Sequence, residues 1–131
     1  MVDVIVRDWL ADQLAVVLPA GFHIERFQRI PDAIVGPTAI LRQERFGRQV
    51  VDGRTIPGGR IVAYTLTLAV QYEDIGTAEA ALDDDVVTLL DALDELGNVR
   101  WITAEKRILS ETTQAPCYDI GIEVPYQHTK G

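Results

Sequence analysis

The stretch "RIVAYTLTLAVQY", Arg60–Tyr72, decides the fold. Its larger apolar side chains fall at every second position, at Val62, Tyr64, Leu66 and Leu68, and smaller or polar residues fill most positions between them. A period of two is typical of a β-strand, and the β-branched and aromatic residues favour the same structure. We therefore predict a strand at the centre of a β-sheet.

Helical and strand patterns surround this central strand. The apolar residues of 4–18 recur at helical spacing, and the sequence "LPAG" ends that helix. A second amphipathic helix runs from Thr77 to Leu96 and stops at Gly97. The remaining strands are predicted at Phe22–Ile30, Thr38–Phe46, Val99–Leu109 and Tyr118–Gln127.

The predicted order is α-β-β-β-α-β-β, in a single domain over residues 1–131. Strands joined by short links form antiparallel pairs, so the fold class is α+β. We expect a mostly antiparallel five-stranded sheet with both helices packed on one face. Pro125 removes one hydrogen-bond donor from the last strand, which indicates an edge strand or the end of a strand.

The segment "GRQVVDGRTIPGG", Gly47–Gly59, is rich in glycine and contains Pro57. This composition predicts a long loop at about 47–59, and connections of this length are usually functional or disordered. Arg48, Arg54 and Arg60 lie in or beside it, interleaved with apolar residues. The segment is either a surface excursion or a binding loop that becomes ordered on assembly.

Bulk composition excludes several classes of protein. The chain has 131 residues, a net charge of −8 and a hydrophobic fraction of 47%, which is ordinary for a globular domain. No apolar run approaches the roughly 20 residues of a membrane span, and the N-terminus lacks the pattern of a signal peptide. The negative charge argues against specific nucleic-acid recognition. A lone cysteine, Cys117, excludes an internal disulfide and fits a reducing compartment.

The charge is distributed unevenly along the chain. Nine acidic residues and no Lys or Arg lie between Ile61 and Val99, whereas His23–Arg60 holds seven arginines against four acids. One part of the molecule is therefore acidic and another rich in arginine.

The acidic part contains "ALDDDVVTLLDALDELGN", Ala81–Asn98. Each helical residue advances about 100°, so Asp83–Asp85 spread around the helix and cannot converge on one metal ion. Asp84, Asp91 and Glu95 fall on one line opposite the leucines. This line is either a solvated face or a contact for an arginine-rich surface of another subunit. The second alternative is considered because like charges at this spacing destabilise an isolated helix, and a cationic partner would offset that cost.

Catalytic signatures are absent from the sequence. His23 and His128 are the two histidines, and neither they nor Cys117 sit in a pattern that would activate a nucleophile. We predict no enzyme activity, no catalytic residue, no metal and no cofactor. Trp9 and Trp101 are interpreted as core or interface anchors.

One family resemblance rests on the element order, the opening helix, the Gly/Pro/Arg segment before "RIVAYTLTLAVQY", the acidic helix and the closing "RWITAEKRIL…CYDIGIEVPYQ" pair. In these features together, the chain resembles the tail terminator proteins of long-tailed bacteriophages. The resemblance covers nearly the whole chain, although the family has no short diagnostic motif. It implies a hexameric ring in the virion, assembled in the host cytoplasm, that caps the tail tube, ends its polymerisation and joins a head–tail connector. On that basis the expected partners are the chain itself, the tail tube protein and the connector protein.

Two alternatives stay open at this point. One is another head–tail connector or minor tail protein, and the other is a small ligand-binding or enzymatic α+β domain with a pocket under the 47–59 segment. The residues assigned to an oligomer or partner interface are Arg48, Arg54, Arg60, Asp84, Asp91 and Glu95.

Overall fold

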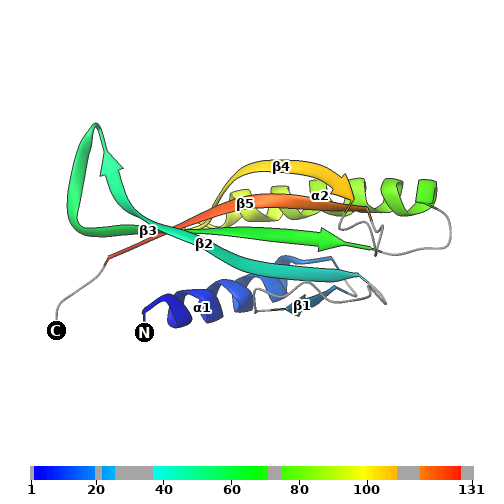
Figure 1. Ribbon diagram of the computed structural model, residues 1–131, viewed down its shortest axis with the longest axis horizontal. Helices are drawn as coiled ribbons and strands as arrows, with labels where there is room; N and C mark the ends of the chain where they lie inside the picture. The colour runs from blue at the N-terminus through cyan, green and yellow to red at the C-terminus, as the bar shows by residue number, and fades with distance from the viewer. Residues whose placement is uncertain (1, 20–21, 26–36, 71–74, 109–115, 128–131) are drawn as a thin grey trace.

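The computed structural model describes residues 2–19, 22–25, 37–70, 75–108 and 116–127 (Figure 1). Two helices and five strands follow one another in the predicted order α-β-β-β-α-β-β. The elements are α1 (Val2–Val17), β1 (His23–Glu25), β2 (Thr38–Val51), β3 (Arg54–Ala69), α2 (Ile75–Glu95), β4 (Arg100–Ile108) and β5 (Pro116–Gln127).

The five strands form one sheet in the order β1-β2-β3-β5-β4. β3 is the central strand, as its alternating pattern predicted, and it pairs with β2 and β5 in antiparallel register. β1 pairs with β2 in parallel, so the sheet is mixed. Residues 26–37 separate these two strands, a span long enough for the crossover that a parallel pair requires. The α+β class and the mostly antiparallel five-stranded sheet are thus confirmed.

Both helices pack on one face of the sheet. Leu66 and Leu68 of β3 share a buried cluster with Leu10 of α1 and with Leu89 and Leu93 of α2. In α2 the buried residues recur every three or four positions, which places them along one stripe of the helix. In the described part of the chain, neither helix has the length and apolar character needed to cross a lipid bilayer.

Pro125 lies near the end of β5 and not on an edge strand. β5 pairs with β3 on one side and β4 on the other, so the edge alternative is wrong. The last pair between β4 and β5 joins Arg100 to Glu123, two residues before Pro125. The proline therefore falls where β5 has outrun β4, a position that tolerates the missing donor.

Candidate assembly interface

The segment 47–59 is a β-hairpin, and the prediction of a long loop there is wrong. β2 runs to Val51, β3 begins at Arg54, and the two strands pair on both sides of an irregularity between Arg48 and Val50. β5 pairs with β3 only as far as Gly59, so the hairpin continues beyond the body of the sheet. Figure 1 shows it projecting from one end of the molecule.

Asp52 and Gly53 form the turn of the hairpin. Their φ angles are 52° and 78°, the left-handed pair that a two-residue type I′ turn requires. Asp-Gly is a strong sequence signal for this turn because glycine adopts a positive φ without strain. The strand signal was hidden by the following "IPGG", residues 56–59.

Residues 56–59 form a bulge within β3. Thr55 pairs with Val50 and Arg60 pairs with Arg48, so four residues of β3 lie opposite Gln49 alone. Bulges are the positions where glycine and proline occur inside paired strands. Here the glycine content marks a distorted strand and not an unpaired loop.

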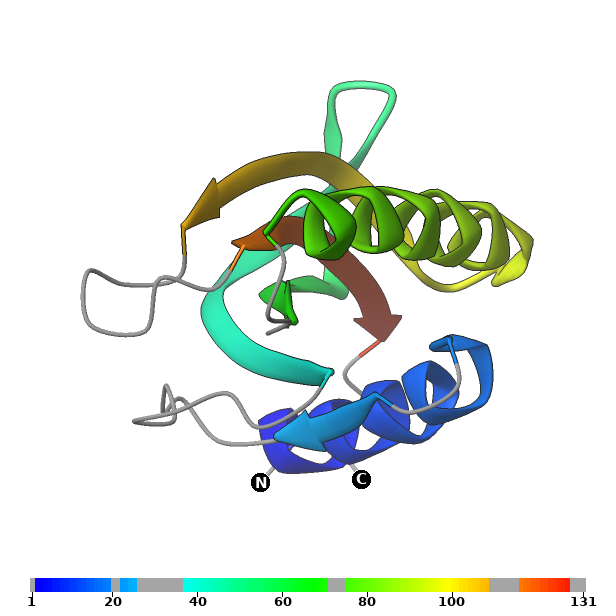
Figure 2. The same ribbon diagram turned by 90° about the vertical axis from the view of Figure 1, so that its right-hand side faces the viewer.

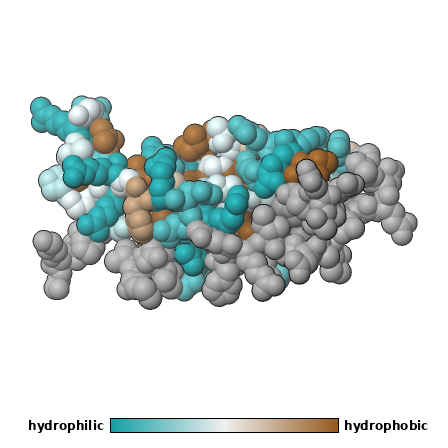
Figure 3. All heavy atoms as spheres, viewed as in Figure 1, coloured by the Kyte–Doolittle hydropathy of each residue, from teal (hydrophilic) through white to brown (hydrophobic). Residues whose placement is uncertain are grey.

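The hairpin exposes both apolar and cationic side chains. Val50 and Val51 are 55% and 48% exposed, and Phe46, directly before the hairpin, is 50% exposed. Arg48 and Arg54 of the hairpin, and Arg60 at its base, are also exposed. Figure 3 shows hydrophilic and hydrophobic residues side by side on this projection. The mixture is typical of a surface that binds another protein, where apolar contacts supply affinity and charges supply orientation.

The outward face of α2 is acidic. Asp84, Asp91 and Glu95 are exposed on it, and Val87, which is 59% exposed, lies between the first two along the helix. The last turn of α2 contains no basic residue that would complement the helix dipole. We call the residues Asp84, Val87, Asp91 and Glu95 the acidic face.

The three consecutive aspartates occupy three different environments. Asp83 accepts a 2.7 Å hydrogen bond from the Tyr118 hydroxyl and lies 2.8 Å from Nζ of Lys106. The hydrogen bond from Lys106, reinforced by that from Tyr118, lowers the pKa of Asp83. Burial, together with the charge of Asp84, raises the pKa of Asp85. Only Asp84 therefore belongs to the exposed line, and Asp83 instead fastens α2 to β4 and β5.

The six predicted interface residues form two separate groups in the single chain. Arg48 and Arg54 lie on the hairpin, Arg60 pairs with Arg48 at its base, and the carboxylates lie on α2 (Figure 1). Within the described part of the chain, none of the six forms an ion pair or side-chain hydrogen bond. The six residues are Arg48, Arg54, Arg60, Asp84, Asp91 and Glu95.

A polar network covers part of the sheet face opposite the helices. Arg107 donates hydrogen bonds from Nε and Nη2 to the carboxylate of Asp119, and the Thr67 hydroxyl donates to the same carboxylate at 2.6 Å. Burial raises the pKa of the neighbouring Cys117 thiol to about 11, although Arg107 acts in the opposite direction. The thiol is therefore protonated at neutral pH and has no nucleophilic character.

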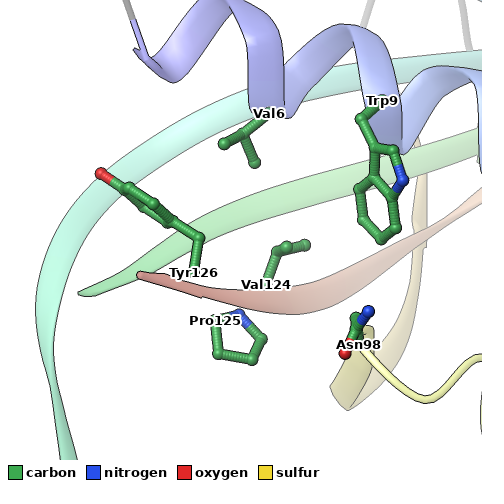
Figure 4. Close-up of a pocket in the computed structure, with 6 residues that line it drawn as sticks. All are labelled: Val6, Trp9, Asn98, Val124, Pro125 and Tyr126. Carbon is green, nitrogen blue, oxygen red and sulfur yellow. The ribbon is translucent and has the colours of Figure 1, made fainter. Parts of the chain in front are cut away.

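A pocket of about 340 Å³ opens between α1, the turn after α2 and the end of β5. Side chains of α1 point toward Val124 of β5 across it (Figure 4). Figure 2 shows the end of β5 between the two helices. This pocket is not lined by any residue of the 47–59 segment. It is lined by Val6, Trp9, Asn98, Val124, Pro125 and Tyr126.

The two tryptophans fulfil different roles. Trp101 donates a 2.9 Å hydrogen bond from its indole nitrogen to Asp94 and packs against the core. Trp9 is 36% exposed and lines the pocket. The sequence indicates that Trp9 is a core or interface anchor. It could not show that Val124 and Tyr126 lie opposite this side chain. That juxtaposition depends on tertiary packing.

No protein-family model matches the chain, and no curated protein matches it. Among solved structures, it is similar to the core region of PilO from the type IV pilus system of Pseudomonas aeruginosa. The identity is 12%, the TM-score is 0.41, and the match covers 93% of this chain and 94% of that chain. With so low a TM-score, this likeness carries no conclusion about what the present chain does.

The identification as a phage tail terminator is withdrawn: no family model and no curated protein supports it, and the solved structure found comes from a type IV pilus system and not from a phage. The bacteriophage, virion, tail-assembly and head–tail joining assignments came only from that resemblance and are not carried further. The prediction rested on element order and charge pattern, and an α-β-β-β-α-β-β order is compatible with many unrelated functions.

Proposed function

We propose that this protein is a structural subunit that assembles with copies of itself, the projecting hairpin of one copy binding the acidic face of the next. The observation that carries this proposal is the separation of charge: exposed cations on and beside the hairpin and exposed carboxylates on α2, with no ion-pair partner among the residues that the structure describes. A second copy supplies the complement of each group.

The contact joins two different surfaces and is therefore heterologous. Contacts of this kind close into a ring if the rotation between neighbours allows it, and otherwise extend into a filament. The sixfold order came with the tail terminator resemblance, so the proposal specifies no number of subunits.

Apolar burial supplies most of the affinity in this arrangement. An exposed ion pair contributes roughly 0.2–1 kcal/mol. Burying one large apolar side chain completely contributes roughly 1.5–3 kcal/mol, and Phe46, Val50 and Val51 each have about half of that still to gain. The arginines and carboxylates then chiefly determine orientation, partner choice and association rate.

A charge-exchange experiment tests the proposal. The hairpin-reversed variant carries Arg48→Glu, Arg54→Glu and Arg60→Glu; the helix-reversed variant carries Asp84→Lys, Asp91→Lys and Glu95→Lys. Each variant alone should keep its fold but lose assembly, because like charges then meet. Mass is measured by sedimentation over a range of concentrations.

An equimolar mixture of the two variants should assemble again. Each reversed surface then finds its complement on the other variant, so both contacts form in alternation. Six units of charge change takes the net charge from −8 to −14 in one variant and to −2 in the other, so nonspecific attraction between oppositely charged molecules cannot explain the rescue. The single reversal Asp91→Lys can also be tested alone. Its matched control is Glu105→Lys, which reverses an exposed carboxylate on β4. A wild-type chain that stays monomeric at millimolar concentration, or a mixture that stays monomeric, would overturn the proposal.

A further inference from the structure

The tip of the hairpin carries apolar residues that ion pairing with α2 does not account for. Val50 and Val51 are about half exposed, and they are consecutive residues of β2. Consecutive side chains of a strand point to opposite faces. The tip is therefore a two-sided apolar wedge, with Arg48 and Arg54 beside it.

The pocket between α1 and β5 is the matching slot. Val6 and Trp9 approach it from α1, and Val124 faces them from β5 (Figure 4). Glu95, an exposed carboxylate of the acidic face, lies three residues before Asn98 in the chain. Apolar walls that adjoin the end of the acidic face complement an apolar wedge flanked by arginines.

A chain cannot place its own tip in its own pocket. The segment from Phe46, which is level with Val124 in the sheet, to Val51 spans about 17 Å of extended strand. The two views agree that the hairpin turns away from α1 (Figures 1 and 2). The occupant must come from another molecule.

We infer that the pocket lined by Trp9, Asn98 and Val124 receives the hairpin tip of a second copy, with one valine against each wall. This inference rests on the proposed self-assembly and specifies its docking site. Val87 on the acidic face is the competing apolar site, but it is a single side chain on a convex helix and can cover only one face of the wedge. A concave site is needed to desolvate both valines.

Site-directed crosslinking distinguishes the two sites. A Val51→Cys chain, tagged so that it differs in mass, is mixed with an untagged Asn98→Cys chain and oxidised mildly, and the heterodimer is measured on a non-reducing gel. A parallel mixture contains Val51→Cys and Val87→Cys. Native Cys117 is buried and protonated, so it does not interfere.

The expected result is a tagged–untagged heterodimer with Asn98→Cys, at least tenfold stronger than with Val87→Cys. The reverse preference would place the tip on the acidic face, overturning this inference while leaving the proposed self-assembly intact. No heterodimer in either mixture, together with a monomeric wild type, would overturn both.

A second variant blocks the slot without altering the core. Asn98 is exposed and has no positive φ, so Asn98→Phe should fold normally and fill the pocket entrance. Assembly should weaken at least tenfold, whereas Glu105→Phe, an equally bulky substitution at an exposed position of β4, should leave it unchanged. Normal assembly of Asn98→Phe would contradict the inference.

Discussion

The body of the sheet and the projecting hairpin differ in whether their side chains find partners within the chain. In the body, Tyr118 of β5 and Lys106 of β4 both bind Asp83 of α2. Beyond the end of β5, the hairpin exposes Val50 and leaves Arg54 unpaired within the described chain. Among the described residues, these side chains of the body have partners within the chain, and those of the hairpin end do not.

This difference separates contacts that stabilise the fold from contacts that are available for binding. A buried leucine in the body already contributes its full apolar surface to folding. A half-exposed valine on the hairpin contributes little until a partner covers it. Substitutions in the two regions should therefore change different measurements.

The largest effect on stability is expected in the core. Leu89→Ala removes a fully buried side chain of α2 and should reduce the free energy of unfolding by about 2–5 kcal/mol. Val50→Ala on the hairpin should change it by no more than about 0.5 kcal/mol. Urea unfolding of both variants at a concentration where the chain is monomeric measures the contrast. Equal losses would show that the hairpin packs on the body and would break the distinction.

A smaller effect is expected on the sheet face opposite the helices. Asp119→Ala leaves the guanidinium of Arg107 and the hydroxyl of Thr67 without their shared acceptor. Hydrogen bonds to charged groups contribute roughly 1.5–3 kcal/mol when buried, and partial exposure here reduces the expected loss to about 1–2 kcal/mol. Thermal or urea unfolding measures it, with Asp91→Ala on α2 as the exposed control.

The same carboxylate should make stability depend on pH. Burial alone would raise the pKa of Asp119, but the hydrogen bonds from Arg107 and Thr67 outweigh it and hold the pKa below the ordinary value of 3.8. The stabilisation is thus fully present above pH 3.8 and is lost as the pH falls through the folded-state pKa. Asp119→Asn should flatten the decline of stability below that pH. An unchanged acid limb would show that the carboxylate does not contribute.

Sequence patterns predicted the parts of this fold that depend on local periodicity. The alternation in Arg60–Tyr72 predicted the central strand, and the leucine spacing predicted α2. The hairpin was missed because "IPGG" indicates a loop on composition alone, whereas the decisive signal was the two-residue "DG" turn, Asp52–Gly53. The exposed charge groups were named from the sequence, but the pocket was not. Trp9 and Val124 are far apart in the chain, and only packing brings them together.

The smallest change in the stability of the whole fold is expected from a substitution at the hairpin turn, where the effect should stay local. Gly53 has a φ of 78°, and a Cβ at this position would meet no atom within 4 Å. Gly53→Ala therefore tests backbone strain alone, expected to cost about 1 kcal/mol. Because the hairpin projects from the body, the strain should open the tip without unfolding the sheet. Amide hydrogen exchange should quicken several-fold at 50–55 and stay unchanged in β5. Exchange that quickened equally in β5 would mean that hairpin and body unfold as one unit, and the contrast between the two regions would be lost.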